Sequence, residues 1–319
     1  MSNRVVTISA MQLKTLVDWP DLVEPVRRAF DVYSQKRAGS AMSILYPQED
    51  RDAGDVYVKS AYDWDSDYFV VKVSPWFRIN AEKNAPQGGL FIVVDSRTGH
   101  TRAIFNEEHY LSDIRTAAAG ALAARYLAPQ NVHTACVVGT GTQALLQAQA
   151  LFSERKFKRL YVWGRDCLKV RRIAKRIGEA LPGVAVLAAA SLESAVKDAE
   201  VIVTTTSSKE PLICGAWLCD GQHVTAIGAD DPSKCELDRE CLERAQLITV
   251  DSLLDGAANG ELYRHQWPLD SNKVVEIGHV LVGRKRGRST PKEITIAKFV
   301  GLGVQDLAAA NEVLMRWEG

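Results

Sequence analysis

A glycine-rich turn between an apolar run and a helical segment constrains this chain more than any other feature. Residues 134–138 (TACVV) are apolar and partly β-branched, which is typical of a buried strand. An Ala-, Leu- and Gln-rich helical segment continues after the turn to residue 149. The turn consists of Gly139, Thr140, Gly141, Thr142, Gln143 and Ala144. A strand, a tight glycine turn and a helix together form a dinucleotide-binding unit.

The small residues of this turn have distinct physical roles. Gly139 lets the chain turn sharply off the strand, Gly141 lets the backbone approach a pyrophosphate, and Ala144 lets the helix pack closely on the strand. The free N–H groups at the helix start, together with the helix dipole, favour phosphate. The turn alone leaves NAD and FAD both open, and the same pattern also occurs at ordinary strand-to-helix turns.

The second strand of this unit bears on the choice of cofactor. Residues 159–163 (RLYVW) predict that strand, and its end lies about twenty residues after the turn, where such folds contact the ribose. Gly164 stands where an acidic residue would favour NAD, and Arg165 can pair with a 2′-phosphate. We therefore expect NADP(H) to be favoured over NAD(H). Asp166 offers an alternative acceptor for the ribose hydroxyls, and Arg165 could instead be a solvated loop charge.

Composition limits the class of protein. The chain has 319 residues, of which 46% are hydrophobic, enough for two domains with a core. Lys and Arg total 39 and Asp and Glu total 39, so no net field attracts nucleic acid or an anionic membrane, and we interpret the basic residues 284–288 as a solvated loop. Residues 1–5 show no signal peptide and no apolar run is long enough to span a membrane, so we expect a soluble, cytoplasmic protein.

Cysteine and histidine spacing gives no sign of a metal site. The six cysteines form no CxxC pair and are most simply reduced thiols, and the six histidines are not spaced as ligands. We therefore expect neither a zinc site nor a disulfide framework. The cysteines are Cys136, Cys167, Cys214, Cys219, Cys235 and Cys241.

The pattern along the chain predicts two domains of different character. Residues 5–9 suggest a strand, and apolar residues at helical spacing predict one helix over residues 11–33. Strands with Asp, Gly, Pro and Asn turns then predict a β-meander that could form one side of a site or a dimer interface. The predicted strands are residues 43–46, 55–62, 68–73, 90–95 and 101–105. An alanine-rich helix over residues 111–128 leads to the glycine turn.

After the glycine turn, strands alternate with helices, which predicts an α/β fold with a Rossmann-type doubly wound parallel sheet. Ligands bind such sheets at the carboxyl ends of the strands. The predicted strands after the second are residues 184–188, 201–205, 223–228 and 247–251, with helices at 168–180 and 192–199. A final strand, glycine turn and helix, beginning at residue 294, could return the chain to the first domain.

Several motifs together resemble the ornithine cyclodeaminase/mu-crystallin family over nearly the whole chain. They are residues 71–74 (VKVS), 111–119 (LSDIRTAAA), the glycine turn, 202–206 (IVTTT), 223–230 (HVTAIGAD) and 300–306 (VGLGVQD). Within the family, residues 54–62 (GDVYVKSAY) with 227–230 (IGAD) are closest to the ectoine-utilisation cyclodeaminase-like branch.

The resemblance implies a homodimer that acts on imines at an α-amino acid carbon. Residues 1–118, completed by 300–319, would form an α+β, β-rich substrate and dimerisation domain, and residues 119–299 would bind NAD(P). Lys72 and Arg115 would hold the substrate carboxylate, and Asp230 would be the acid/base residue, with Lys72 also close to the chemistry. Cofactor binding is assigned to Gly139, Thr140, Gly141, Thr142, Gln143, Arg165, Thr204, Thr205, Thr206, Gly228, Val300 and Gly301.

These residue types suit the chemistry. Arg binds a carboxylate through two parallel charge-assisted hydrogen bonds, and Lys adds a point charge. Hydride transfer to an imine requires a proton that a carboxyl group can supply or stabilise. Each residue also has a structural alternative: Lys72 as a sheet-surface lysine, Arg115 as a helix-start ion pair, and Asp230 as the N-cap of the next helix.

Two departures from the family pattern affect the expected reaction. Residues 41–45 (AMSIL) lack an arginine that the family commonly uses for the carboxylate, and residues 57–59 (YVK) stand where ornithine cyclodeaminases have a glutamate. We hypothesise that Lys59 replaces the arginine; the alternative is an exposed strand lysine. We therefore expect an NAD(P)-dependent imine reductase or amino-acid dehydrogenase. The alternatives are a redox-neutral cyclodeaminase and a non-catalytic NADPH- or small-ligand-binding protein.

Overall fold

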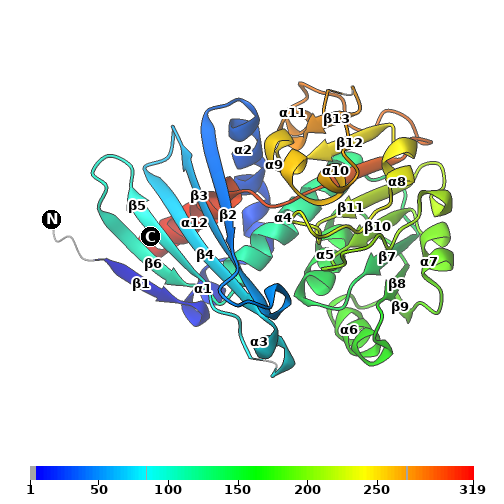
Figure 1. Ribbon diagram of the computed structural model, residues 1–319, viewed down its shortest axis with the longest axis horizontal. Helices are drawn as coiled ribbons and strands as arrows, with labels where there is room; N and C mark the ends of the chain where they lie inside the picture. Colours follow the sequence, from blue (N-terminus) through cyan, green and yellow to red (C-terminus); the bar gives the residue numbers. More distant parts are fainter. Residues whose placement is uncertain (1–4, 84, 271) are drawn as a thin grey trace. The chain divides into compact units, whose positions relative to one another are not determined.

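The computed structural model describes residues 5–83, 85–270 and 272–319. The expectation that residues 1–5 show no signal peptide falls largely on residues 1–4, which lie outside the described part. The chain forms two compact units (Figure 1). Unit 1 comprises Met1–Ala118 with Leu302–Gly319, and unit 2 comprises Ala119–Gly301. Within the described ranges, no helix has the length and apolar character needed to cross a membrane.

Unit 1 contains a six-stranded sheet in the order β1-β6-β5-β4-β3-β2. Strands β2 to β6 form the predicted antiparallel meander, and β1 runs parallel to β6 at one edge. Side chains alternate between the two faces, as the period of two in the sequence requires. The strands are β1 (Val6–Ser9), β2 (Ala38–Leu45), β3 (Gly54–Asp63), β4 (Tyr68–Phe77), β5 (Leu90–Asp95) and β6 (Thr101–Asn106).

The final helix, α12, packs against β3, β4 and β2 and against α2, so the C-terminal segment belongs to unit 1 (Figure 1, red). The predicted single helix over residues 11–33 is wrong. The chain leaves α1 at Val17, Asp18 caps a new turn, and Pro20 cannot continue a hydrogen-bonded helix. The helices are α1 (Ala10–Leu16), η1 (Trp19–Leu22), α2 (Val23–Ser34), η2 (Arg51–Ala53), α3 (Arg78–Glu82), α4 (Tyr110–Leu127) and α12 (Gly303–Glu318).

Unit 2 contains an eight-stranded sheet in the order β13-β12-β14-β11-β10-β7-β8-β9, in which all recorded pairings are parallel. The predicted doubly wound Rossmann-type sheet is therefore confirmed. The strands are β7 (Thr134–Val138), β8 (Arg159–Trp163), β9 (Ala185–Ala188), β10 (Val201–Thr204), β11 (His223–Ala226), β12 (Leu247–Val250), β13 (Val274–Glu276) and β14 (Thr295–Lys298).

Strand β7 is central to unit 2 and is buried on both faces. Cys136 and Val138 belong to one apolar cluster, whereas Ala135 and Val137 belong to the other, as expected for a strand covered by helices on both sides. The strand order reverses between β7 and β10, which makes their carboxyl ends the switch point where such sheets bind ligands.

Helices connect these strands. They are α5 (Thr142–Glu154), α6 (Cys167–Ala180), α7 (Leu192–Asp198), η3 (Gly215–Trp217), α8 (Arg239–Arg244), α9 (Leu253–Ala258), α10 (Gly260–Arg264) and α11 (Ile277–Leu281). Helices α5, α6 and α7 were predicted, whereas the short helices after β10 were not, because a few residues show no clear period.

Candidate functional site

The glycine turn after β7 requires its first glycine. Gly139 has a φ of +139°, and a Cβ placed there would lie 2.1 Å from Thr205 Oγ1. Its N–H donates to the carbonyl of Trp163 over 2.9 Å, while Thr205 N donates to Val138 O over 2.8 Å. The turn is thus tied to both neighbouring strands, and any side chain at Gly139 would disturb it.

Gly141 differs from Gly139 because a Cβ built on it meets nothing within 4 Å. It is the N-cap of α5, where no side chain caps the helix and no acidic residue lies in the first turn. Thr142 is exposed, and Thr140 and Gln143 are half-buried beside it. Ala144 is fully buried, which allows close packing of α5 on the sheet. The open space at Gly141 and the helix start that follows it fit a phosphate-bearing dinucleotide.

The end of β8 has little room for a side chain. A Cβ on Gly164 would lie 2.6 Å from Thr140 Cγ2, so an acidic residue could not replace this glycine without a shift of the turn. Arg165 is exposed. Asp166 caps α6, where its Oδ1 accepts from Leu168 N over 2.9 Å and from Lys169 N over 3.1 Å. The Lys169 amide holds the pKa of Asp166 below its ordinary value. Asp166 therefore has a structural role of its own.

A buried glutamate that sequence reasoning missed joins the ends of β10 and β11. Glu236 Oε1 accepts from Thr206 N over 2.6 Å and from Thr206 Oγ1 over 2.8 Å. Its Oε2 accepts from Thr204 Oγ1 and Gly228 N, each over 2.8 Å. Thr204 has no exposed surface, so its hydroxyl serves Glu236. Burial, reinforced by the nearby Glu261, raises the pKa of Glu236 to about 7. Its spacing in the sequence matches no motif.

Asp230 lies beyond the carboxyl end of β11. Its Oδ1 is 2.7 Å from Lys234 Nζ, and its side chain is 31% exposed. The N-cap alternative for Asp230 is wrong, because the next helix, α8, is capped by Asp238. The adjacent Asp231 is buried and forms a local turn by accepting from Ser233 N over 2.6 Å. Asp230 thus retains an accessible carboxylate next to a lysine.

The predicted cofactor residues Val300 and Gly301 follow β14, and their amides are held by a buried aspartate. Val300 N and Gly301 N donate to Asp251 Oδ2 over 3.0 and 2.6 Å. Burial raises the pKa of Asp251 to about 6. These amides therefore order the end of β14 against the end of β12.

Unit 1 brings Lys72 and Arg115 together on one buried carboxylate. Lys72 Nζ lies 2.8 Å from both carboxylate oxygens of Asp306, and Arg115 Nε lies 2.9 Å from Oδ1. Asp306 has no exposed surface. Although burial opposes ionisation, Lys72, Arg115 and Lys59 outweigh it and hold the pKa of Asp306 below its ordinary value. The structural alternative is wrong for Lys72, which is buried and not on the sheet surface. Arg115, near the start of α4, does form the ion pair that its alternative expected, with Asp306 of α12.

Lys59 belongs to the same cluster. It lies opposite Lys72 in the β3–β4 register and opposite Met42 in the β2–β3 register, so the three side chains share one sheet face. Lys59 is only 4% exposed, so the exposed-lysine alternative is wrong. The segment that lacks the family's arginine, residues 41–45, therefore runs on the strand directly beside Lys59.

Glu107 completes this cluster through Ser112. Lys72 Nζ donates to Ser112 Oγ over 3.2 Å, and that hydroxyl donates to Glu107 Oε1 over 2.7 Å. Glu107 is fully buried. Three basic side chains thus lie close to two acidic ones. We call this group the cation cluster; it consists of Lys59, Lys72, Arg115, Glu107 and Asp306. Counted by formal charge, three basic and two acidic side chains leave one positive charge in excess, which suits a ligand with one carboxylate.

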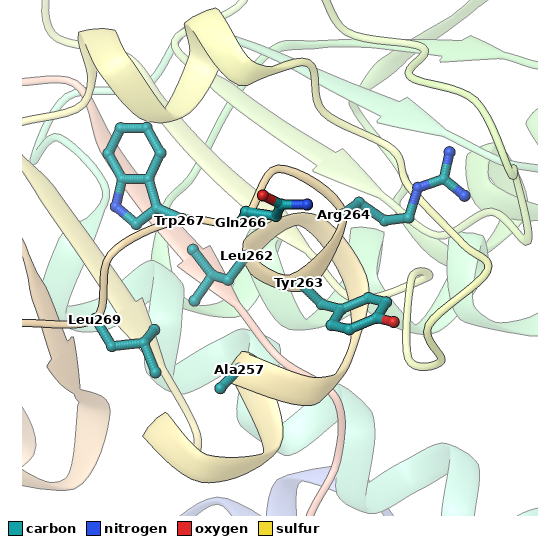
Figure 2. A pocket seen from close by; sticks show the side chains of 7 residues that line it. All are labelled: Ala257, Leu262, Tyr263, Arg264, Gln266, Trp267 and Leu269. Carbon is teal, nitrogen blue, oxygen red and sulfur yellow. The ribbon is translucent and has the colours of Figure 1, made fainter.

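A separate surface pocket of about 400 Å³ lies in unit 2 and contains none of the predicted site residues (Figure 2). Trp267 and Leu269 line one part of it, and Tyr263 and Arg264 point the other way (Figure 2). The remaining lining residues are Ala257, Leu262 and Gln266. Among the residues that the structure describes, no group of three or more His, Cys, Asp or Glu side chains could hold a metal ion.

Comparison with known proteins places these features in a family context. The model of the ornithine cyclodeaminase/mu-crystallin family matches residues 1–319. The chain is 35% identical over 305 residues to an uncharacterised cyclodeaminase of Sinorhizobium fredii, covering 93% of this chain and 91% of that protein. It is 33% identical over 232 residues to a Δ1-pyrroline-2-carboxylate reductase of Bacillus cereus, covering 72% and 70% of the two chains.

A solved structure shares the fold over almost the full length. It is an archaeal alanine dehydrogenase dimer with bound NAD, with a TM-score of 0.87 and 28% identity, covering 98% of this chain and 95% of the other. The relatives thus carry names from three reaction types, so likeness alone leaves the specific reaction open.

Proposed function

The chain belongs to the ornithine cyclodeaminase/mu-crystallin family, and on this premise we propose that it is an NAD(P)-dependent oxidoreductase that reduces a small α-imino acid or dehydrogenates the matching α-amino acid. The observation that carries the proposal is the cation cluster in unit 1. A buried site with one excess positive charge favours a small carboxylate ligand over a neutral one, because low solvent access strengthens the charge interaction. The glycine turn of unit 2 supplies the matching dinucleotide site.

Substrate recognition is assigned to Lys72, Arg115 and Lys59. Asp306 holds Lys72 and Arg115 in fixed geometry, so that their remaining donors are oriented before a ligand arrives. Lys59 adds the charge that the family's arginine would otherwise supply. Its place opposite Lys72 supports this assignment.

Proton transfer is assigned to Asp230. When bound, the nicotinamide supplies or accepts a hydride, and the substrate nitrogen must gain or lose a proton in the same reaction. A half-exposed carboxylate beyond a strand's carboxyl end can stabilise the protonated imine or accept the proton from an amine. Lys234, 2.7 Å from Asp230 Oδ1, favours the ionised form of that carboxylate.

A redox-neutral cyclodeaminase is the second candidate. The 35% identity to an uncharacterised cyclodeaminase favours it. The ectoine-utilisation branch expected from residues 54–62 and 227–230 is not among the names of these relatives, and it remains a hypothesis. Lys59 argues against ornithine as substrate, because it occupies the region where ornithine cyclodeaminases have a glutamate. A non-catalytic binding protein, as in the crystallin branch, is the remaining alternative.

For the cofactor, we propose a nicotinamide dinucleotide held by Gly139, Gly141 and the start of α5. The preference for NADP(H) remains a hypothesis based on Gly164 and Arg165. The structural relative contains NAD, which gives that preference no support. Asp166 uses one carboxylate oxygen as a helix cap, which limits its role in recognising the ribose.

We further propose that the protein is a homodimer. The alanine dehydrogenase relative is a dimer. In unit 1, the sheet face opposite Lys59 and Lys72 is apolar and only half-buried, which is the character of a face that a second copy would cover. That face carries Val56, Val58, Phe69, Val71, Val73, Leu90, Ile92 and Ile104.

The test is a substrate panel assayed with both NADH and NADPH. We expect the reduced cofactor to be consumed with a cyclic imine carboxylate, or with a keto acid plus an amine, and Asp230→Asn to abolish turnover while cofactor binding persists. Asp220→Asn, at an exposed position, is the matched control. Release of ammonia from a diamino acid without net cofactor change would establish the cyclodeaminase instead. Cofactor binding with no turnover of any substrate in the panel would support the non-catalytic binding protein.

A further inference from the structure

We propose that Glu236 is a positioning residue that sets the orientation of Asp230 by holding the segment between β11 and Asp230. The inference rests on the proposed role of Asp230. Glu236 has no exposed area, and its carboxylate contacts Thr204, Thr206 and Gly228, three residues assigned to cofactor binding. Its influence would pass through the backbone of residues 228–230.

The carboxylate of Glu236 joins two strand ends at once. Each oxygen accepts one backbone N–H and one hydroxyl: Oε1 from Thr206 N and Oγ1, and Oε2 from Gly228 N and Thr204 Oγ1. Four donors on two oxygens match an ionised carboxylate, which is an acceptor only. The loop after β10 and the loop after β11 are therefore fixed to a common point.

Ala229, which lies between Gly228 and Asp230, is held by Lys298. Glu236 N donates to Glu261 Oε1 over 2.7 Å, and Glu261 Oε2 lies 3.3 Å from Lys298 Nζ. Lys298 Nζ in turn donates to the carbonyl of Ala229. Gly228 and Ala229, the two residues immediately before Asp230, are thus held by Glu236 and Lys298. Both of these partners are buried within unit 2.

The segment has no space in which to relax. A Cβ on Gly228 would lie 2.1 Å from Thr206 O and 2.4 Å from Thr206 N. The two backbones are therefore in direct contact at this point, and a rotation of Gly228 would collide with Thr206. We therefore expect a change in the Glu236 hydrogen bonds to shift the backbone of residues 228–230 and with it the carboxylate of Asp230.

The protonation state of Glu236 matters for this geometry. An amide places an NH2 group at one oxygen position, which cannot accept from the N–H of Thr206 or of Gly228, so one of these two bonds is lost. Protonation of the carboxylate removes its negative charge and so weakens the same bonds. The ionisable groups around Glu236 are Glu261 on α10, Lys298 on β14 and the adjacent Cys235. Glu261 opposes ionisation of Glu236, and Lys298 favours it.

The experiment compares Glu236→Gln with the wild-type protein and with Glu193→Gln, an exposed glutamate on α7 whose partner is Lys197. The first readout needs no substrate: the backbone amide resonances of Thr206 and Gly228 are followed by NMR as pH is varied. We expect a common midpoint near pH 7 in wild type and in Glu193→Gln, and no such titration in Glu236→Gln. The second readout is turnover, which we expect to fall on the order of 100-fold in Glu236→Gln and to stay unchanged in Glu193→Gln.

The two readouts separate failure of this inference from failure of the proposed function. If wild type turns over no imine or amino acid, the proposed function fails, and the amide titration still tests the hold on residues 206 and 228. If Glu236→Gln keeps the wild-type turnover, the inference is overturned, whether or not the amide titration is lost. If Glu236→Gln does not fold, Thr204→Val removes one donor without change of shape. That variant should raise the amide midpoint, and an unchanged midpoint would overturn the inference.

Discussion

Lys59 and Lys72 lie directly opposite each other on β3 and β4, and both are buried. Like charges in such cross-strand positions repel, and burial removes the water that would screen them. They coexist because Asp306 approaches from α12 and Glu107 from the turn before α4. The sheet therefore concentrates positive charge in a place where only acidic side chains, or an acidic ligand, can compensate it.

Replacement of Lys59 by alanine should weaken substrate binding more than it slows turnover. Loss of one charge-assisted contact to a carboxylate costs about 1.5–3 kcal/mol, which corresponds to roughly a 10- to 150-fold rise in KM. Steady-state kinetics of Lys59→Ala beside Lys83→Ala, an exposed lysine of the same unit, would measure this. An unchanged KM in Lys59→Ala would remove Lys59 from the substrate site.

Asp306→Asn should destabilise the protein strongly, because it leaves Lys72 and Arg115 buried without their shared carboxylate. Removing one partner of a buried ion pair costs about 3–5 kcal/mol. Urea denaturation monitored by circular dichroism gives the free energy of unfolding. Asp67→Asn, whose partner Arg97 is 81% exposed, is the control and should change stability little. Equal stabilities of the two variants would contradict the buried pairing.

The same variant makes a prediction for pH dependence. The pKa of Asp306 is lower in the folded protein than in the unfolded chain, so the carboxylate stabilises the fold above its unfolded value of about 4. This contribution is lost as pH falls toward the lowered folded value. The difference in unfolding free energy between wild type and Asp306→Asn should therefore be largest near neutral pH and shrink below pH about 4. A difference independent of pH would show that packing, rather than charge, is lost.

Gly141→Val should abolish dinucleotide binding while the fold persists. The Cβ at this position has open space, so the side chain would occupy the volume assigned to the pyrophosphate without colliding with the protein. Titration of NADH and NADPH by fluorescence, with the melting temperature measured in parallel, checks both parts. Gly139→Ala is the contrasting variant and should lower the melting temperature, because its φ of +139° and the contact with Thr205 both oppose a side chain. Normal NADPH binding by Gly141→Val would remove the glycine turn from the cofactor site.

Arg165→Ala should separate the two cofactors. If Arg165 pairs with a 2′-phosphate, its loss weakens NADPH binding by about tenfold or more and leaves NADH binding unchanged. Arg171→Ala, an exposed arginine further along α6, serves as the control. If Arg165→Ala binds NADPH and NADH with the same affinities as wild type, Arg165 is a solvated loop charge.

Local signals in the sequence predicted the glycine turn and the strands around it, because turn chemistry and burial on both faces act within a few residues. Asp306 and Glu236 could not be found in this way. Asp306 meets Lys72 only after the chain returns from unit 2, and Glu236 gains its partners only when β10 and β11 pair. The position of Lys59 required the β3–β4 register, which places it opposite Lys72 rather than in solvent.

Helix α12 makes unit 1 depend on both ends of the chain, which matters for the order of folding. The strands that carry Lys59 and Lys72 are made first, together with Glu107, but Asp306, the carboxylate that contacts Lys72 directly, follows residues 119–301. During synthesis on a ribosome, we therefore expect Lys59 and Lys72 to stay hydrated, and unit 1 to stay incomplete, until unit 2 and helix α12 have emerged. Completion of unit 1 would then be a late event in folding, and its timing would depend on translation of the intervening unit.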